Sequence, residues 1–264
     1  MLVVSDIHGA FDALTSVAAR SETLLILGDL ANLTDYRTGE GAVAKALGLE
    51  FARDAARARG EGDFERMRTI WRTRSGDPDA ARKGIEDAVN AQYEMLSTAL
   101  NDFRGYVIHG NVDLPDSLIE ALPAGFDYVH GKTVEIEGVT FGFAGGGVTT
   151  PLKAAGEVSD VEMAATLDSL GEVDVLCTHV APALGPLETD VITGRRERSS
   201  RPILDYINKS QPRMHLFGDV HQPQASRWRI GRTQCVNVGY FRATGRAFRL
   251  DVSDLRAANL RSET

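Results

Sequence analysis

The sequence predicts an α/β fold, a four-layer αββα sandwich of two mixed sheets flanked by helices, with a helical insert. Residues 1–28 show a strand–helix–strand pattern, in which an amphipathic helix from Phe11 separates two apolar runs. Residues 133–143 alternate at period two around a Glu137-Gly138 turn, which is typical of a hairpin and indicates a second, partly antiparallel sheet. Two halves that each build a sheet predict the sandwich.

Composition limits the classes of function. The chain has 264 residues, of which 43% are apolar, enough for one sizeable core, and its formal net charge is −8. An acidic chain lacks the overall basic footprint of nucleic-acid-binding proteins, so nucleic acid is a possible but not a favoured partner. The two cysteines, Cys177 and Cys235, lie in apolar runs and are expected to be buried thiols.

The sequence indicates no membrane partner. No apolar run approaches the ~18 residues that would span a bilayer. The first residues enter a strand without a charged leader or a cleavage site. We therefore expect a cytoplasmic protein.

Residues 1–264 are expected to form one domain, interrupted by a helical insert at about residues 36–103. The spacing of apolar residues predicts one helix through residues 43–51 and another beyond the glycines of residues 60–62. Asp77-Pro78 combines an N-cap residue with a proline at the first helical position, and it indicates the start of a third helix.

The insert is charged differently from the rest of the chain. Residues 37–83 hold eleven Lys or Arg and eight Asp or Glu. One interpretation is a solvated helical face. The other is a cap over a functional site, or a contact in a homo-oligomer, that presents arginines to an anionic substrate. The candidates for this role are Arg53, Arg57, Arg66 and Arg72.

The second half of the chain continues the alternation of helices and strands. Ser159 and Glu162 have the spacing of a capping box that opens a helix. Apolar runs at residues 173–178 and 213–218 predict two strands, and residues 225–252 contain three more strand-like runs.

A basic loop occupies residues 195–201. Its Arg195, Arg196 and Arg198 are candidates for contact with a phosphate oxygen or a nucleotide. Charged loops are also commonly solvated without binding anything, so both interpretations stay open.

Five short polar stretches each follow an apolar, strand-like run. The first is Ser5-Asp6-Ile7-His8-Gly9. The candidate ligands that the five stretches supply are Asp6, His8, Asp29, Asn111, His179, Asp219 and His221. Open α/β sheets place their sites at the carboxyl ends of the strands, so we expect these side chains to meet there. Carboxylate, amide and imidazole ligands suit divalent metals, and seven of them suffice for two ions that share one carboxylate.

In this order the five stretches resemble the motifs of the calcineurin-like metallophosphoesterases. That family carries Asp-x-His, Gly-Asp, Gly-Asn-His, a lone His and Gly-His-x-His, and the resemblance spans residues 1 to about 240 apart from the insert. It is nearest to a subgroup of small bacterial and archaeal phosphodiesterases that lack the His of Gly-Asn-His. The resemblance implies the same αββα fold and a binuclear metal centre.

The resemblance also assigns the ligands to two ions. One ion would be held by Asp6, His8, Asp29 and His221, and the other by Asp29, Asn111, His179 and Asp219. In such centres the ions lie ~3.5–4 Å apart and share a hydroxide that attacks phosphorus in line, so Asp29 and Asn111 are also candidate catalytic residues. Manganese is the expected metal, with Fe, Mg or Zn as possible alternatives.

Two positions depart from the family's pattern. Val112 stands where a histidine would be the general acid, whose loss costs roughly 10²–10⁴ in rate for poor leaving groups. His109 and Asp113 are candidate catalytic substitutes, and the alternative for His109 is a strand histidine satisfied by a neighbour. Asp219 replaces another histidine. It either ligates the second ion, favouring Mn or Mg over Zn, or leaves that site weak or empty.

The sequence therefore predicts a two-metal phosphohydrolase, with a phosphodiesterase for small or nucleotide-like diesters favoured over a monoesterase. The missing histidine at Val112 leaves room for a second hypothesis, a catalytically weak metal-binding scaffold that holds a protein partner through the insert. The arginines of the insert leave room for a third, a nuclease.

Overall fold

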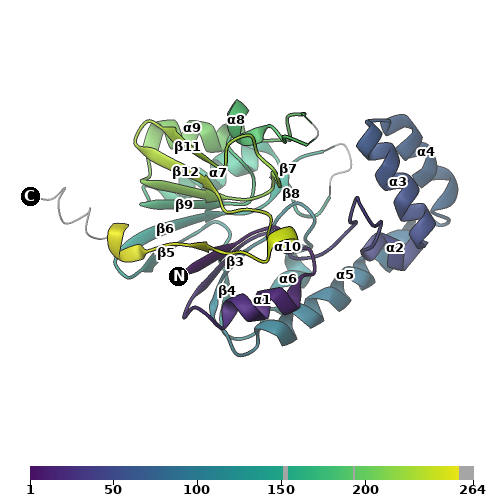
Figure 1. Cartoon of the computed structure of the whole chain (residues 1–264), viewed down its shortest axis with the longest axis horizontal. Helices are drawn as coiled ribbons and strands as arrows, with labels where there is room; N and C mark the ends of the chain where they lie inside the picture. The colour runs from purple at the N-terminus through teal and green to yellow at the C-terminus, as the bar shows by residue number, and fades with distance from the viewer. Residues whose placement is uncertain (151–153, 193, 256–264) are drawn as a thin grey trace, which may run out of the picture.

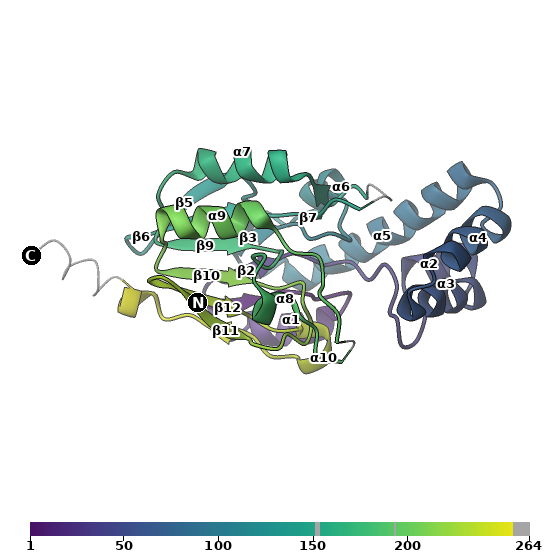
Figure 2. The same cartoon turned by 90° about the horizontal axis from the view of Figure 1, so that it is seen from above.

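Two large sheets pack face to face, with helices on both outer faces, in the computed structural model of the chain (Figures 1 and 2). The structure describes residues 1–150, 154–192 and 194–255. One apolar core lies between the sheets and two others lie between each sheet and its helices, so the predicted four-layer sandwich is confirmed.

The first sheet has the strand order β13-β1-β2-β3-β4. β1 to β4 are parallel, and β13 pairs antiparallel with β1 at the edge. The strands are β1 (Leu2–Val4), β2 (Leu24–Leu27), β3 (Gly105–Ile108), β4 (Phe126–Tyr128) and β13 (Phe248–Arg249). β1 and β2 are buried along their whole length, as expected of central parallel strands covered on both faces.

The second sheet has the strand order β11-β12-β10-β9-β6-β5. Its strands are β5 (Lys132–Ile136), β6 (Val139–Ala144), β9 (Val175–Thr178), β10 (Met214–Phe217), β11 (Arg227–Ile230) and β12 (Thr233–Asn237). The β5–β6 hairpin is confirmed, and its turn residues Glu137 and Gly138 both have positive φ, of 54° and 77°. A short parallel pair, β7 (Gly147–Val148) and β8 (Glu157–Val158), lies apart from both sheets.

Helices cover the two outer faces. On the first sheet lie α1 (Phe11–Ala18), α6 (Pro115–Ala121), α10 (Phe241–Thr244) and part of α5 (Pro78–Leu100). On the second sheet lie α7 (Asp160–Leu170), α8 (Gly185–Glu188) and α9 (Arg201–Ser210). The capping box at the start of α7 is confirmed, because Ser159 and Glu162 each bond the other's backbone N–H.

The insert packs around a core of its own. Its helices α2 (Ala42–Leu47), α3 (Leu49–Glu61) and α4 (Phe64–Arg74) lie to one side of the sandwich and bury Phe51 and Ile70 among other residues (Figure 1). The prediction of one continuous helix through residues 43–51 was wrong. Gly48 adopts φ 93° and ends the helix, although the apolar spacing continues across it.

Helix α5 belongs to the insert at one end and to the sandwich at the other (Figure 2). Asp77 caps it as predicted, by accepting from the backbone N–H of Asp79 and Ala80. Its last turns bury Leu96 and Leu100 against the first sheet. Within the described residues no helix has both the length and the apolarity needed to cross a bilayer.

Two neighbouring residues test whether the last turns of α5 support the core of the first sheet. Leu96 is fully buried, and Met95 is 60% exposed. We expect Leu96→Ala to lower the free energy of unfolding by about 2–5 kcal/mol through lost burial and a residual cavity. Met95→Ala should change it by less than about 0.5 kcal/mol. Urea unfolding of both variants measures the difference, and equal small effects would show that this part of α5 does not support the core.

Candidate metal centre

The structure brings all seven predicted ligands together. They follow β1, β2 and β3 of the first sheet and β9 and β10 of the second, each at the carboxyl end of its strand. Contacts of 4.0 Å or less join them into one continuous network. Residues as far apart as Asp6 and His221 thus meet at a common edge, as predicted.

Asp29 occupies the middle of this network. Its Oδ2 lies 3.6 Å from Nε2 of His8, and its Oδ1 lies 3.4 Å from Nε2 of His179. The two carboxylate oxygens therefore face two different histidines. His179 Nε2 is also 3.1 Å from Oδ1 of Asn111 and 3.7 Å from Oδ1 of Asp219. This is the arrangement expected of a carboxylate that bridges two ions.

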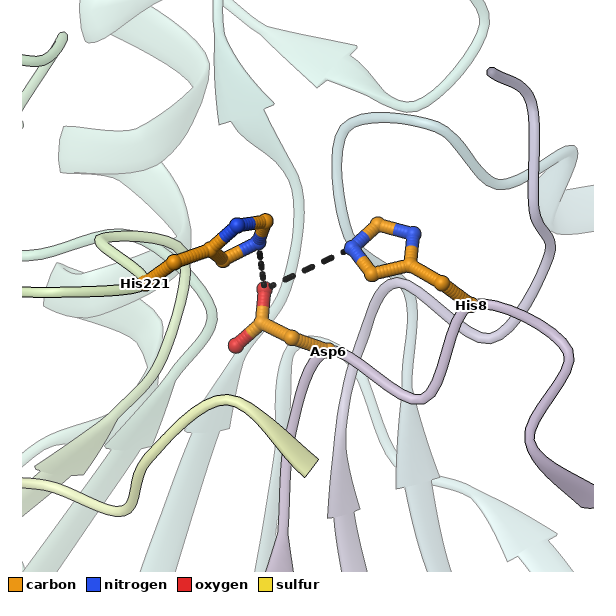
Figure 3. A group of neighbouring side chains, drawn as sticks. All are labelled: Asp6, His8 and His221. Carbon is orange, nitrogen blue, oxygen red and sulfur yellow. Dashed lines mark ion pairs between the residues drawn. The ribbon is translucent and has the colours of Figure 1, made fainter. Parts of the chain in front are cut away.

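Asp6 organises the other side of the centre. One of its oxygens, Oδ1, lies 3.4 Å from Nε2 of His221 and 4.0 Å from Nε2 of His8 (Figure 3). The other oxygen accepts from the backbone N–H of Asp219 at 3.1 Å. The Asp6 side chain is 1% exposed, so its charge requires a partner inside the protein.

Two histidines are oriented by backbone carbonyls. Nδ1 of His8 lies 3.2 Å from the carbonyl oxygen of Ala31, and Nδ1 of His179 lies 2.8 Å from that of Leu27. Each Nδ1 donates its proton there, so Nε2 is the nitrogen that faces the carboxylates and that a cation would reach. Histidines that ligate metals are held in this way by a bond at the second nitrogen.

The backbone is strained at the same positions. Of the six non-glycine residues with positive φ in the described part of the chain, four are predicted ligands: Asp6, His8, Asp29 and Asp219, at φ 59°, 43°, 54° and 64°. Such conformations cost of order 1–3 kcal/mol each and persist mainly at functional sites. Their concentration here is independent support for a ligand-binding centre.

Two buried atoms at the centre make no hydrogen bond to any residue that the structure describes. They are Oδ1 of Asp6 and Nε2 of His8, and both belong to the predicted ligand set. Three-residue groups able to hold an ion are Asp6, His8 and His221, and also Asp6, Asp29 and His179. Oxygen and imidazole donors without internal partners fit divalent metal ions.

Burial and neighbouring charges shift the pKa values of three residues at the centre, Asp29, Asp219 and His179. Burial raises the pKa of Asp29 to about 7 and that of Asp219 to about 6. Burial also opposes the charged form of His179, but the carboxylates of Asp29, Asp219 and Asp6 outweigh it and raise the pKa of His179 to about 9. Without a metal ion, these side chains therefore tend to stay protonated, and a cation that binds them must displace the protons.

Asp113 is one of the two residues proposed to replace the missing acid, and the structure gives its carboxylate other partners. Oδ1 accepts from the backbone N–H of Leu30 and Ala31 at 3.0 and 3.2 Å and from the Tyr93 hydroxyl at 3.1 Å, and Oδ2 accepts from Gly110 N–H at 2.8 Å. The residue is 1% exposed. These bonds hold together the loops that carry Asp29 and Asn111.

His109 is the other residue proposed to replace the missing acid, and its ring contacts Tyr128 and His130. Its Nδ1 is 2.6 Å from the Tyr128 hydroxyl, and its ring packs 5.0 Å from that of His130. Burial lowers its pKa to about 3, which keeps the imidazole neutral. These contacts match the alternative of a strand histidine satisfied by a neighbour, and a catalytic role stays a prediction. Val112 contacts the centre through its backbone, because its N–H donates a hydrogen bond to Oδ1 of Asp29 at 3.1 Å.

The three arginines of the basic loop contact the protein itself. Arg196 pairs with the buried Glu188 at 3.5 Å, and Arg198 donates to the carbonyl of Thr149 at 3.0 Å. A Cβ placed on Gly62, between α3 and α4, would lie 3.3 Å from Nη1 of Arg195. The loop thus touches the insert, and its contact with substrate remains a prediction.

Two residues beside the centre were not predicted from the sequence. Tyr240 stacks on His221 with ring centroids 3.8 Å apart and planes 3° from parallel, and Arg242 donates to the carbonyl of His8. Both follow the turn after β12. Tyr240 follows His221 by 19 residues and Arg242 follows His8 by 234, and no spacing signal marks either pair, so only the folded arrangement reveals them.

Comparison with known proteins supports the fold. No family model and no curated protein matches the chain. One crystal structure matches with a TM-score of 0.66 at 15% identity, over 96% of this chain and 95% of that chain. The crystal structure of TT1561 of Thermus thermophilus matches with a TM-score of 0.50 at 14% identity, over 95% of this chain and 97% of that chain. Identities this low show a shared fold and nothing finer.

The protonation of the centre predicts how metal binding depends on pH. A cation must displace the protons of His179 and Asp29, whose pKa values are raised to about 9 and about 7. Affinity for Mn²⁺ should therefore rise from pH 6 to pH 8, by up to about tenfold per pH unit for each proton released. Calorimetry at constant ionic strength measures it. His179→Gln should show a shallower slope, and a pH-independent affinity in the unmodified protein would contradict the assignment.

The bonds of Asp113 predict that it supports both stability and metal binding. Asp113→Asn places an amide N–H against backbone N–H donors, so it should lower the free energy of unfolding by about 1–3 kcal/mol. It should also weaken Mn²⁺ binding. The exposed Asp116→Asn is the matched control and should change stability by less than about 0.5 kcal/mol. An Asp113→Asn variant as stable as the control would exclude this supporting role.

Proposed function

We propose that this protein is a two-metal phosphohydrolase of the calcineurin-like metallophosphoesterase superfamily, acting on small or nucleotide-like phosphodiesters. The observation that carries the proposal is the position of Asp29, whose two oxygens face His8 and His179 on opposite sides. A buried carboxylate that divides its oxygens in this way is suited to bridging two cations. The shared fold of the solved structures is compatible with this class of enzyme and does not by itself assign it.

In this proposal the protein's residues hold the ions and orient the substrate. Asp6, His8 and His221 would hold one ion, Asn111, His179 and Asp219 would hold the other, and Asp29 would contribute to both sites. When bound, such ions lower the pKa of a water so that it becomes a nucleophile near neutral pH, and they neutralise the phosphate oxygens. The carbonyls of Leu27 and Ala31 keep His179 and His8 in the tautomer that can ligate.

The chemistry of position 112 favours a particular range of substrates. Valine donates no proton, and neither His109 nor Asp113 presents an uncommitted acid to the centre. In this proposal the residues that surround position 112 would give the leaving oxygen little help from an acid. Substrates with stable leaving groups suit such a site best, because general acid catalysis contributes least to them.

Asp219 favours manganese or magnesium in the second position. Its carboxylate lies 3.7 Å from His179 Nε2, and its side chain is 23% exposed. A carboxylate in place of an imidazole makes the ligand set richer in oxygen, which harder cations prefer. We therefore propose Mn²⁺ as the working ion.

Turnover of a chromogenic phosphodiester tests the proposal. With Mn²⁺ added, the unmodified protein should hydrolyse bis(p-nitrophenyl) phosphate, whose nitrophenolate leaves without an acid. Asp29→Ala and Asn111→Ala should reduce hydrolysis to the background rate because each removes a ligand of the second ion. Asp12→Asn, which changes an exposed carboxylate on α1, should keep full activity.

Two other results would favour the remaining hypotheses. Absence of turnover with Mn²⁺, Fe²⁺, Mg²⁺ and Zn²⁺, together with measurable metal binding, would favour a scaffold that holds a protein partner through the insert. Tight binding of DNA or RNA that weakens steeply with salt would favour a nuclease.

A further inference from the structure

A loop of the insert is fastened to the candidate metal centre by a half-buried ion pair. Arg242 of α10 places Nε 3.2 Å and Nη2 3.0 Å from Oδ2 of Asp35, whose side chain is 7% exposed. The same guanidinium donates through Nη1 to the carbonyl of His8, and the Arg242 backbone N–H donates to the carbonyl of Asp6 at 3.0 Å. The position of residues 35–40 is therefore fixed relative to two predicted ligands.

The loop is also rigid internally. Asp35 Oδ1 accepts from the backbone N–H of Arg37 at 2.8 Å and of Thr38 at 3.1 Å. The carbonyl of Thr38 accepts from Nε of Arg53 on α3 at 2.9 Å. A side chain in this loop is thus presented at a defined place next to the centre, and not on a freely moving segment.

That side chain is Tyr36, an exposed aromatic residue. It is 56% exposed, whereas most large apolar residues of the chain are buried. The Arg59 guanidinium carbon lies 5.1 Å from the centroid of its ring. The loop that carries Tyr36 is held beside His8 by the Asp35–Arg242 pair, so the ring lies on the insert side of the centre.

Arg59 differs from the arginines of the insert that are already bonded to other residues. Arg53 is bonded to Thr38, Arg66 pairs with Glu61 at 3.2 Å, and Arg74 pairs with Asp54. Arg59 forms no ion pair with the residues that the structure describes, and Tyr36 is its stacking partner. An uncommitted guanidinium beside an anion-binding centre is available to an anionic ligand.

The basic loop of residues 195–201 lies next to the end of α3. Arg195 lies against Gly62, where α3 ends, and Asp190 N–H donates to its carbonyl at 3.0 Å. Gly62 follows Arg59 by less than one helical turn. The basic loop, the end of α3 and the Tyr36 loop therefore gather on one side of the metal centre.

We propose that Tyr36 and Arg59 form a subsite for the nucleoside part of a phosphodiester whose phosphate binds at the metal centre. Arg59 stacks on the ring of Tyr36 and adds positive charge, and the accessible surface of the ring receives the base. Stacking of a base on an aromatic side chain is worth about 1–3 kcal/mol and tolerates any base. This inference rests on the proposed phosphodiesterase activity and names the class of substrate.

Two diesters with the same leaving group test the subsite. Thymidine 5′-(p-nitrophenyl phosphate) carries a nucleoside where methyl p-nitrophenyl phosphate carries a methyl group. With Mn²⁺, Tyr36→Ala and Arg59→Ala should each raise KM for the nucleoside diester by about tenfold, in line with a loss of ~1.4 kcal/mol. Their kcat should stay unchanged, as should both constants for the methyl diester. Tyr36→Phe should keep most of the affinity because the ring is retained.

Arg82→Ala is the matched control. Arg82 is an exposed arginine of the insert whose guanidinium pairs with Asp79 at the start of α5, so both KM values should stay unchanged. The subsite is excluded if Tyr36→Ala and Arg59→Ala leave both KM values unchanged, or raise the two alike.

Failure of the enzyme proposal gives a different result. If the unmodified protein hydrolyses neither diester, the phosphodiesterase assignment falls. Calorimetry of thymidine 5′-monophosphate binding to the Mn²⁺-loaded protein then tests the subsite alone. Binding that weakens about tenfold in Arg59→Ala but not in Arg82→Ala would support the subsite, while equal or absent binding in both would overturn it.

Discussion

The geometry of the metal centre depends on the buried carboxylate of Asp113. Its two oxygens collect three backbone N–H groups and one phenol from the loops after β2 and β3 and from α5. A buried charge is tolerated when it is bonded in this way, and losing any partner exposes its full desolvation penalty. Because Tyr93 of α5 is one of these partners, the insert's last helix and the ligand loops are positioned by the same contact.

The close approach of these loops requires glycine. A Cβ on Gly110 would collide with Oδ1 of Asp29, and one on Gly218 would collide with Oγ of Ser5. Together with the positive φ values of four ligands, such crowding makes the metal-free centre costly to fold. Ions that bind the folded state alone would offset that cost, so stability and metal occupancy are expected to be linked.

The strands, and the meeting of the seven polar side chains at one edge, were predictable because both follow local rules. Apolar runs mark the strands, and the polar residue at each carboxyl end needs no knowledge of the rest of the chain. The role of Asp113 was not predictable in this way, since two of its donors, Leu30 and Ala31, lie more than 80 residues earlier. The same holds for Arg242 and Asp35, which are 207 residues apart. The helix break at Gly48 was missed because the apolar spacing on either side preserves the helical period.

The insert and the valine at position 112 bear on different steps of the proposed reaction. The proposed subsite at Tyr36 and Arg59 would contact a part of the substrate that does not change during the reaction, so it would bind ground state and transition state equally. Binding of this kind lowers KM and leaves kcat as it is. The missing acid, in contrast, affects the departure of the leaving oxygen and so acts on kcat. The nucleoside subsite therefore cannot compensate for Val112. An enzyme built in this way selects its substrate through the insert and relies on the stability of the leaving group for its rate.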